Sequence, residues 1–376
     1  MLFTVAGIML CLPLTVHVIK SDGEKDALGG SFSYIERPVL SLEKWLKGEY
    51  QDHMERYASE NVGLRPMFIR IHNQIAYTVH NYARANSIII GKKNFLHGQA
   101  YIDAYVGKDF IGHDSIREKV FKLKKIQDTL ARKNISLAVI LAPGKASFYP
   151  ETIPDRYLKN GKETTNYEVY LEELQKQQVN HLDLKHWFLQ MKDTSRYPLF
   201  PKGGIHWSHY GEVLAADTIL NYVEQLTQLP FADVVISGME TSRRMRFTDE
   251  DIEDGMNLLF DVPDLEMAYP HYRIEPDTSG GKPKVLAVSD SYYWGMYNWG
   301  FSKVALNGGE FWYYHNDIHP AHDGSPRFVK DENILENLEK HRAVILISTD
   351  ANLYKFAYGF IEDIYQIYYS GDTLSE

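Results

Sequence analysis

The stretch that decides how we expect this chain to fold is KVLAVSDSYYW, residues 284–294. Val285 to Val288 is a short apolar run, which is typical of a strand buried in a parallel sheet. A small and polar turn follows at once, and open α/β sheets bind their ligands at the carboxyl ends of such strands. A sharp turn there pushes the hydroxyl of Ser291 out of the sheet, as in other strand-turn nucleophiles. The sequence therefore predicts an α/β protein with a reactive serine at this position.

A serine hydroxyl is a weak nucleophile near neutral pH, so Ser291 needs a neighbouring base. The stretch GGIHWS, residues 203–208, offers one in His206. The alternative is that Ser291 only caps a helix and that His206 is a core histidine, and the residues alone leave both interpretations open. His206 and His209 have no third ligand nearby in the sequence, so we reject a metal pair and expect no metal and no cofactor.

Composition restricts the class of protein. The 376 residues suffice for one large α/β domain with additions or for two domains. The net charge of -10 argues against a nucleic-acid partner. The single cysteine, Cys11, gives neither a disulfide framework nor a thiolate metal site. Most of the 49 aromatic residues (26 Tyr, 17 Phe and 6 Trp) are expected in the core, although Tyr and Trp rings also suit stacking on sugars.

The N-terminal region reads as an export segment followed by a linker. Residues 2–19 are mostly apolar and just long enough to span a bilayer. No small-residue cleavage site follows them, which favours an uncleaved signal or anchor over residues 1–20. We expect a linker at 21–40, an N-terminal helical region at 41–85, and one domain at 86–376 with an acid-rich excursion at about 230–283.

Hydrophobic periodicity over 86–376 alternates between strands and helices. Strands are predicted at 136–142, 181–184, 285–288 and 343–347, and helices at 115–133, 167–178 and 209–226. A further amphipathic helix is predicted at about 65–85. Alternation of this kind is typical of a parallel sheet with flanking helices.

Six stretches, in order over roughly residues 40–370, resemble the AlgJ/AlgX-like family of alginate O-acetyltransferases. They are YQ (50–51), NVGLR (61–65), IIGK (89–92), APGKASFYPE (142–151), GIHWS (204–208) and SDSY (289–292). The resemblance implies an SGNH-hydrolase-like three-layer fold in a permuted order, with the histidine before the serine. It also implies export to the periplasmic face of the inner membrane, with an N-terminal anchor. The implied partners are a polysaccharide substrate and a membrane-bound O-acyltransferase as acetyl donor.

In that family the serine is the nucleophile, the histidine is the base, and an aspartate two positions before the histidine orients it. The matching position here is Gly204, and no acid stands between Arg196 and Glu212. Such a third group fixes the tautomer of the imidazole, so its loss matters. Three explanations stay open: a backbone carbonyl or a distant acid takes the role, Asp290 takes it, or the protein only binds glycan. With a carbonyl as substitute, Gly204→Asp should raise slow esterase turnover if the site has room.

The sequence thus predicts an exported, membrane-tethered O-acetyltransferase of polysaccharide, with Ser291 carrying the acetyl group and His206 moving the proton. The alternatives are a carbohydrate acetyl esterase and a catalytically weak glycan-binding or assembly subunit. Further candidate residues support the turn or the oxyanion (Asp290, Tyr292, Asn316) or bind substrate (Trp207, Tyr313). Asn316 can equally be a turn residue, and Trp207 can equally be a packing residue.

Overall fold

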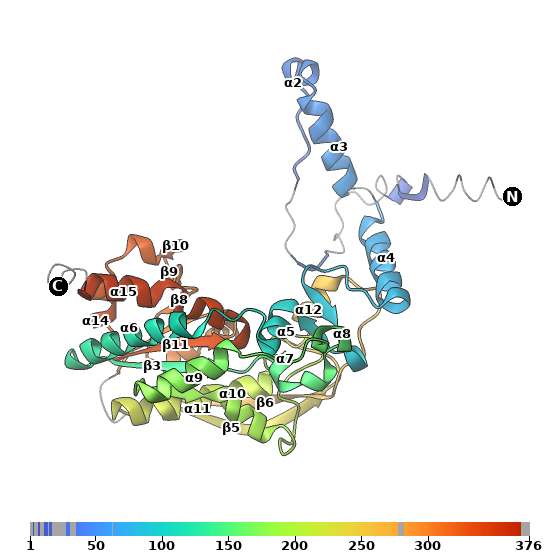
Figure 1. Ribbon diagram of the computed structural model, residues 1–376. Coiled ribbons are helices and arrows are strands. Elements are labelled where there is room, and N and C mark those ends of the chain that lie inside the picture. Colours follow the sequence, from blue (N-terminus) through green and yellow to red (C-terminus); the bar gives the residue numbers. More distant parts are fainter. Residues whose placement is uncertain are drawn as a thin grey trace. The chain divides into compact units, whose positions relative to one another are not determined.

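The computed structural model describes residues 28–30, 35–61, 63–276 and 282–369, together with Phe3, Gly7, 11–13, 15 and 16 (Figure 1). The chain forms two units. The first consists of residues 1–88 and 252–262, and the second of residues 89–251 and 263–376.

Helices make up the first unit. They are α2 (Leu42–Leu46), α3 (Glu49–Asn61), α4 (Arg65–His80) and most of α12 (Asp251–Met256). Ser41 begins α2, because its hydroxyl accepts a hydrogen bond from the main-chain N–H of Lys44 at 3.3 Å. The amide of Asn73 donates to the carbonyl of Met256 at 2.8 Å, which ties α4 to α12 although 183 residues separate the two side chains in sequence.

One prediction about the N-terminal region is corrected. In the part of the chain that the structure describes, no helix is both long and apolar enough to cross a bilayer. This overturns the predicted placement on the periplasmic face of the inner membrane by an N-terminal anchor. Most of residues 2–19, from which that placement is inferred, lie outside the described residues.

The second unit is built on a sheet with the strand order β10-β9-β8-β7-β11-β3-β4. The five strands from β8 to β4 are parallel, whereas β9 and β10 run antiparallel at one edge, so the sheet is mixed rather than purely parallel. The strands are β3 (Ser136–Ala142), β4 (His181–Asp183), β7 (Val285–Ser289), β8 (Phe311–Tyr313), β9 (Asp317–His322), β10 (Ser325–Phe328) and β11 (Ala343–Thr349). A separate pair, β1 (Ile88–Ile90) and β2 (Leu96–Gly98), precedes them.

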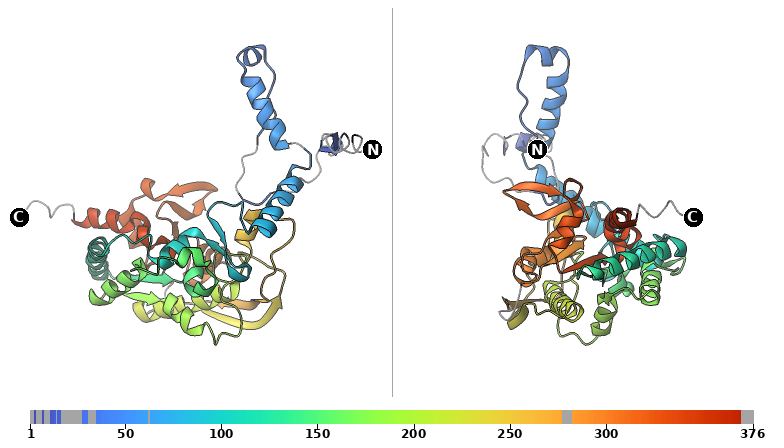
Figure 2. Two further views of the ribbon diagram at one scale, coloured as in Figure 1. Left: turned by 45° about the vertical axis from the view of Figure 1, so that its right-hand side comes forward. Right: turned by 90° about the vertical axis from the view of Figure 1, so that its left-hand side faces the viewer.

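Helices cover both faces of this sheet (Figures 1 and 2). Alternate side chains of each central strand point to opposite faces, so β3, β7 and β11 supply two separate hydrophobic cores. One face is covered by α6 (His113–Arg132), α9 (Asn166–Lys176), α14 (Ile334–Glu339) and α15 (Phe360–Tyr369). The other is covered by α5 (Gln99–Val106), α7 (Lys145–Phe148), α10 (Leu184–Met191), α11 (His209–Thr227) and α13 (Tyr293–Asn298). A short helix, α8 (Asp155–Leu158), lies between α7 and α9 in sequence.

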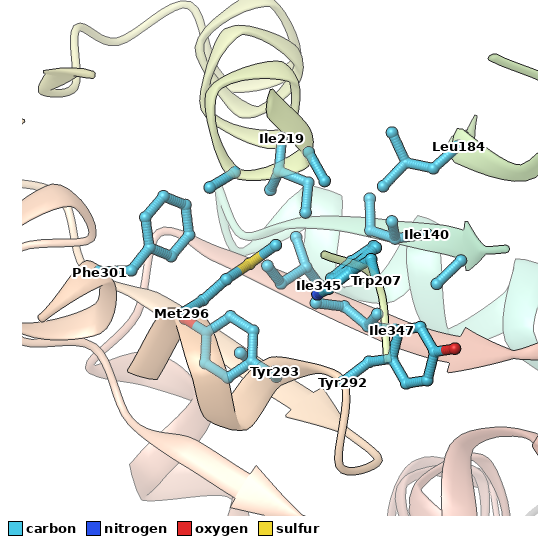
Figure 3. Close-up of a cluster of buried hydrophobic side chains, with 14 of the residues drawn as sticks. Ile140, Leu184, Trp207, Ile219, Tyr292, Tyr293, Met296, Phe301, Ile345 and Ile347 are labelled. Carbon is cyan, nitrogen blue, oxygen red and sulfur yellow. The ribbon is translucent and has the colours of Figure 1, made fainter. Parts of the chain in front are cut away.

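Trp207 belongs to the core between the sheet and the helices α5, α7, α10, α11 and α13 (Figure 3). Its side chain is 2% exposed, and its ring lies 5.1 Å from the ring of Tyr292 and 6.0 Å from that of Phe188. A ring enclosed in this way has no free face for a sugar. The structure therefore places Trp207 in the core beneath the site, which is the packing role that the sequence left open, and not where a sugar could stack on it.

The acid-rich segment predicted at about 230–283 contains an antiparallel ribbon. Its strands are β5 (Asp233–Ser242) and β6 (Met267–Glu275), which pair over their whole length apart from one irregularity between Ile236 and Gly238. The connection between the two strands carries Asp251 and Asp264, two partly buried acids that contact the segment before and at His206.

Candidate active site

The serine turn, residues 289–292, follows directly from β7. Asp290 is fully buried, and its carboxylate accepts hydrogen bonds from the N–H of Tyr292 (3.1 Å), the N–H and hydroxyl of Thr349 (3.0 and 2.8 Å) and the amide of Asn352 (2.8 Å). Thr349 ends β11, the strand that pairs with β7. Asp290 therefore fixes the turn to the neighbouring strand, and its oxygens are used there rather than on the histidine.

His206 lies between Ser291 and an acid that the sequence did not single out. Its Nε2 is 3.0 Å from the hydroxyl oxygen of Ser291, and its Nδ1 is 2.5 Å from Oδ2 of Asp251. The other oxygen of Asp251 accepts the N–H of Ile205 at 2.7 Å, which fixes the carboxylate in place. Of the three explanations for the missing aspartate, the geometry selects the distant acid, 45 residues beyond the histidine.

Gly204 explains why the acid stands elsewhere. A Cβ atom at this position would overlap the carbonyl oxygen of Thr248 and lie 2.9 Å from the carbonyl of Asp249. The connection that brings Asp251 to His206 thus fills the space that a side chain at 204 would need. The expectation that Gly204→Asp could restore a local aspartate fails on this contact.

Residues 201–206, which we call the histidine loop, are held by charged side chains on two sides. The ammonium of Lys145 donates to the carbonyls of Gly204, Lys202 (2.9 Å) and Pro201 (3.4 Å). The carboxylate of Asp264 accepts the N–H groups of Lys202 and Gly203, each at 3.0 Å. The main chain before His206 is therefore fixed by hydrogen bonds at nearly every residue.

Lys145 is 1% exposed, an unusual position for a lysine. Burial lowers the pKa of Lys145 to about 7, and the nearby charges of Asp251 and Asp264 oppose that shift. The sequence placed Lys145 only in a stretch that resembles the family, and its role in holding the loop becomes visible only in the fold.

Tyr292 links the serine turn to the histidine loop. Its side chain is 1% exposed, and its hydroxyl donates to the carbonyl of Ile205 at 2.9 Å. Burial raises the pKa of Tyr292 well above its ordinary value, with the charges of Tyr101 and Asp290 adding to the effect. Tyr292 is therefore a neutral hydrogen-bond donor that joins the two segments.

The two remaining candidates lie at the end of β8. Tyr313 is half-buried and pairs in register with Ser289, so it stands beside the serine turn. Asn316 is exposed in the turn from β8 to β9, where its main chain bonds to Tyr313 (3.0 Å) and Val329 (2.9 Å). Among the described residues, no hydrogen bond joins the Asn316 side chain to Ser291, His206 or Asp251. The structure thus brings Tyr313 to the site and leaves Asn316 as a turn residue.

Sequence reasoning found the serine and the histidine and missed Asp251. The available signal was the acidic run Asp249-Glu250-Asp251 inside the excursion. No spacing rule connects that run with His206, because the connection depends on how the β5–β6 ribbon folds back. Together, Ser291, His206 and Asp251 form the hydrogen-bonded row that nucleophilic acyl transfer requires.

Part of the chain is similar to known proteins. The family model of the SGNH hydrolase-like domain of the acetyltransferase AlgX matches residues 98–247. No curated protein matches the sequence. Among solved structures, the O-acetyltransferase domain of Pseudomonas putida AlgJ is 16% identical, with a TM-score of 0.47, over 75% of this chain and 99% of that one.

Two further solved structures are similar at the same low level. Pseudomonas aeruginosa AlgX is 14% identical, with a TM-score of 0.43, over 73% of this chain and 66% of that one. Bacillus cereus PatB1 with a sulfonyl adduct is 12% identical, with a TM-score of 0.46, over 73% of this chain and 99% of that one.

The family model includes His206 and Lys145, whereas Asp251 and Ser291 lie beyond its match. The model supports the predicted SGNH-hydrolase-like α/β fold and, at a coarse level, a relation to acetyltransferases. The predicted resemblance of the chain to the AlgJ/AlgX-like family is thereby confirmed, on the family model, over residues 98–247.

Proposed function

We propose that this protein is an O-acetyltransferase that passes acetyl groups to a polysaccharide through an acyl-serine intermediate. The observation that carries the proposal is the row of hydrogen bonds from Ser291 through His206 to Asp251. A half-buried hydroxyl at a strand end, with an imidazole at 3.0 Å, is the arrangement in which a base removes the proton as the oxygen attacks an ester carbonyl.

In the first half of the reaction, the oxygen of Ser291 bonds to the acetyl carbonyl carbon while Nε2 of His206 takes its proton. The tetrahedral intermediate then collapses, the bond to the donor oxygen breaks, and His206 returns the proton to the leaving alcohol. Asp251 keeps the proton of the neutral ring on Nδ1, so that Nε2 is free to act, and stabilises the imidazolium that forms.

In the second half, a sugar hydroxyl takes the place of the donor alcohol. His206 removes its proton, the sugar oxygen attacks the acetyl carbonyl, and the bond to Ser291 breaks with return of the proton to the serine. Water in place of the sugar would give hydrolysis by the same steps. The resemblance to alginate acetylation proteins suggests a membrane-bound O-acyltransferase as the donor's source, and we include that partner in the proposal.

The test is mass spectrometry of the intact chain after brief incubation with p-nitrophenyl acetate, followed by peptide mapping. We expect an adduct with the mass of one acetyl group on Ser291 and none in Ser291→Ala. Ser289→Ala is the matched control, because that serine lies two residues earlier at the end of β7, is fully buried and makes no hydrogen bond through its hydroxyl.

Acetylation of Ser291→Ala at the wild-type rate would refute the nucleophile. Absence of any adduct in the wild-type protein would favour a glycan-binding subunit instead. Adding an oligosaccharide acceptor then separates transfer from hydrolysis, because transfer yields an acetylated sugar and hydrolysis yields free acetate.

A further inference from the structure

A hollow of 280 Å³ lies in the second unit beside the serine turn. It is lined by residues from α13, β8, β9 and β10, among them Trp294, Tyr313, Asp317, Ile318, His319 and Arg327. Trp294 stands three residues after Ser291, within one helical turn of it, and Tyr313 pairs in register with Ser289. The hollow is therefore lined by a helix and a strand that flank the serine turn on either side.

Aromatic rings form the wall of this hollow. The ring of Trp294 lies 5.4 Å from that of Tyr313 and 4.7 Å from that of His319. Trp and Tyr rings present flat apolar faces with a polar edge, which suit the C–H faces of a sugar ring. Burial lowers the pKa of His319, against an opposing effect of Asp317, so the imidazole is neutral at neutral pH.

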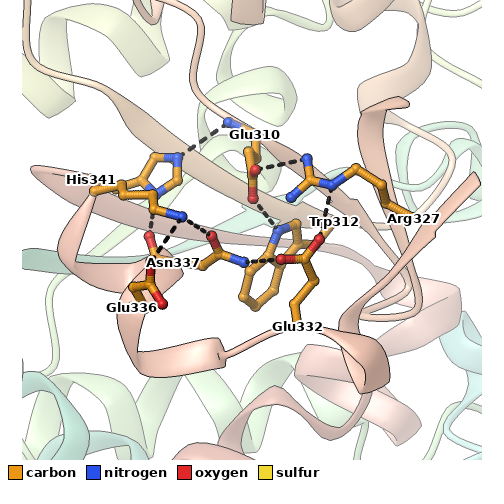
Figure 4. A network of polar contacts seen from close by, with 8 residues as sticks. Glu310, Trp312, Arg327, Glu332, Glu336, Asn337 and His341 are labelled. Atoms are coloured by element: carbon orange, nitrogen blue, oxygen red, sulfur yellow. Dashed lines mark hydrogen bonds and ion pairs between the residues drawn. The ribbon is translucent and has the colours of Figure 1, made fainter. Parts of the chain in front are cut away.

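The residues that line the hollow offer no unpaired cation to an anionic occupant. Arg327 is the one Lys or Arg among the residues that line it, and its guanidinium is held by Glu310 and Glu332, each at 2.9 Å (Figure 4). Glu310 and Glu332 neutralise this guanidinium, and Asp317 is the one carboxylate among the residues that line the hollow. A carboxylate of a uronic acid placed here would meet like charge and no free cation.

The electrostatic potential at the hydroxyl of Tyr313 is also unfavourable for a negative charge. Burial raises the pKa of Tyr313, and the charges of Asp290 and Asp317 raise it further. Negative charge in the surroundings disfavours a phenolate and, for the same physical reason, would disfavour a bound carboxylate.

We propose that this hollow is a subsite for an uncharged sugar ring of the polysaccharide, next to the ring that receives the acetyl group. The assignment of the occupant to the acceptor rests on the proposed function. It makes the acceptor a neutral glycan and disfavours a polyuronate such as alginate. Trp294 and Tyr313 would bind the ring by stacking, while Asp317 would accept a hydrogen bond from a sugar hydroxyl.

The experiment measures binding without turnover, so that it does not depend on catalysis. Intrinsic tryptophan fluorescence of the full chain carrying Ser291→Ala is titrated with β-1,4-mannohexaose, cellohexaose and the β-1,4-mannuronate hexasaccharide. The first and the last differ only by oxidation at C6. We expect at least one neutral hexasaccharide to bind and the mannuronate to bind about tenfold more weakly or not at all.

Substitutions of residues that line the hollow test whether the fluorescence change arises from binding there. Trp294→Phe should remove most of the fluorescence change, and Trp294→Ala should weaken binding of the neutral sugar about tenfold. Asp317→Asn should reduce the preference for the neutral over the charged hexasaccharide. Trp45→Ala, which removes a half-exposed tryptophan of the first unit, is the control and should change nothing.

Equal or tighter binding of the mannuronate, or binding that Trp294→Ala leaves unchanged, would overturn the proposal, as would failure of every hexasaccharide to bind. These failures are distinguishable from a failure of the proposed function, because the acetyl adduct on Ser291 is measured with a small ester that needs no sugar subsite. If Ser291 is acetylated but no sugar binds, the proposed acyl-transfer site stands and only the assignment of this hollow as a sugar subsite is refuted.

Discussion

The serine turn and the histidine loop meet at one site but are held in different ways. The turn lies at the end of a central strand, and Asp290 joins it to Thr349 on the adjacent strand of the same sheet. The histidine loop belongs to no strand or helix, and its fixed points are Lys145, Asp264 and Asp251, from segments up to 62 residues away. The nucleophile is therefore positioned by the sheet, whereas the base is positioned by side chains.

This difference shows how the acid that contacts the histidine can stand at another place in the sequence and still reach the same ring nitrogen. The histidine loop is fixed by contacts from other segments, so the connection between β5 and β6 can bring a carboxylate to His206 although the position two residues before the histidine is a glycine. The serine turn leaves no such freedom, because its geometry follows from β7 and its neighbour. The predictions below test this contrast between the two segments.

The largest effect is expected from Asp251→Asn. The amide can still accept the N–H of Ile205, but its NH₂ would face Nδ1 of His206 and force the proton onto Nε2, which then cannot act as a base. We expect esterase activity on p-nitrophenyl acetate to fall by on the order of 10²–10⁴-fold, with little change in thermal stability. Asp261→Asn, an exposed carboxylate in the same connection, is the control. An activity loss of less than threefold would exclude Asp251 from the row.

Gly204→Asp should lower activity rather than restore it. The new side chain would overlap the main chain at Thr248 and Asp249 and displace the connection that carries Asp251. Overpacking of this kind costs about 1–3 kcal/mol, and we expect turnover to drop about tenfold or more. Steady-state kinetics beside a thermal melt measures both effects. A gain in turnover would mean that the loop and the connection can move apart.

Asp290→Asn should act on stability where Asp251→Asn acts on rate. In the wild type, an N–H group, a hydroxyl and an amide all donate to the carboxylate of Asp290. The NH₂ group of an asparagine cannot accept hydrogen bonds, so at least one of these donors would lose its acceptor. We expect a loss of about 1–3 kcal/mol in the free energy of unfolding, measured by urea titration. If stability were unchanged while activity vanished, Asp290 would belong to the reaction and the contrast drawn here would fail.

The smallest effect is expected from Lys145→Met, which keeps an unbranched side chain one atom shorter and removes its donors. The histidine loop loses hydrogen bonds to three carbonyls, and we expect kcat to fall about tenfold or less while Ser291 still becomes acetylated. Rates that match the wild type would show that Asp264 and Asp251 suffice to hold the loop.

Lys145→Met should also change how the free energy of unfolding depends on pH. The pKa of Lys145 is about 7 in the folded chain and has an ordinary value of 10.5, so the unfolded chain binds the proton more tightly. The contribution of this group to the free energy of unfolding is therefore full above pH 10.5 and is lost as the pH falls towards 7. Urea titrations between these limits should show a rise of stability with pH that Lys145→Met lacks. An identical slope in both proteins would mean that burial does not depress this pKa.

The sequence by itself determined the parts whose signals are local. The apolar runs of β3, β7 and β11 are continuous, because strands covered by helices on both faces have no polar side. The pairing of Ser291 with His206 also followed from local motifs, since each stands in a short stretch of recognisable chemistry. The division into domains and the roles of Tyr313 and Asp290 in the reaction stay predictions.

Only the tertiary structure decided what the distant contacts do. Trp207 stands beside the histidine in sequence, yet packing encloses its ring, because the chain enters α11 through the core. Asp251 stands far from His206 in sequence, yet the ribbon of β5 and β6 carries it there. Periodicity and spacing report the neighbours of a residue along the chain. Whether a carboxylate can contact His206 depends on its neighbours in space. For Asp251, these neighbours depend on the path of the 24-residue connection between β5 and β6, which no local sequence pattern encodes.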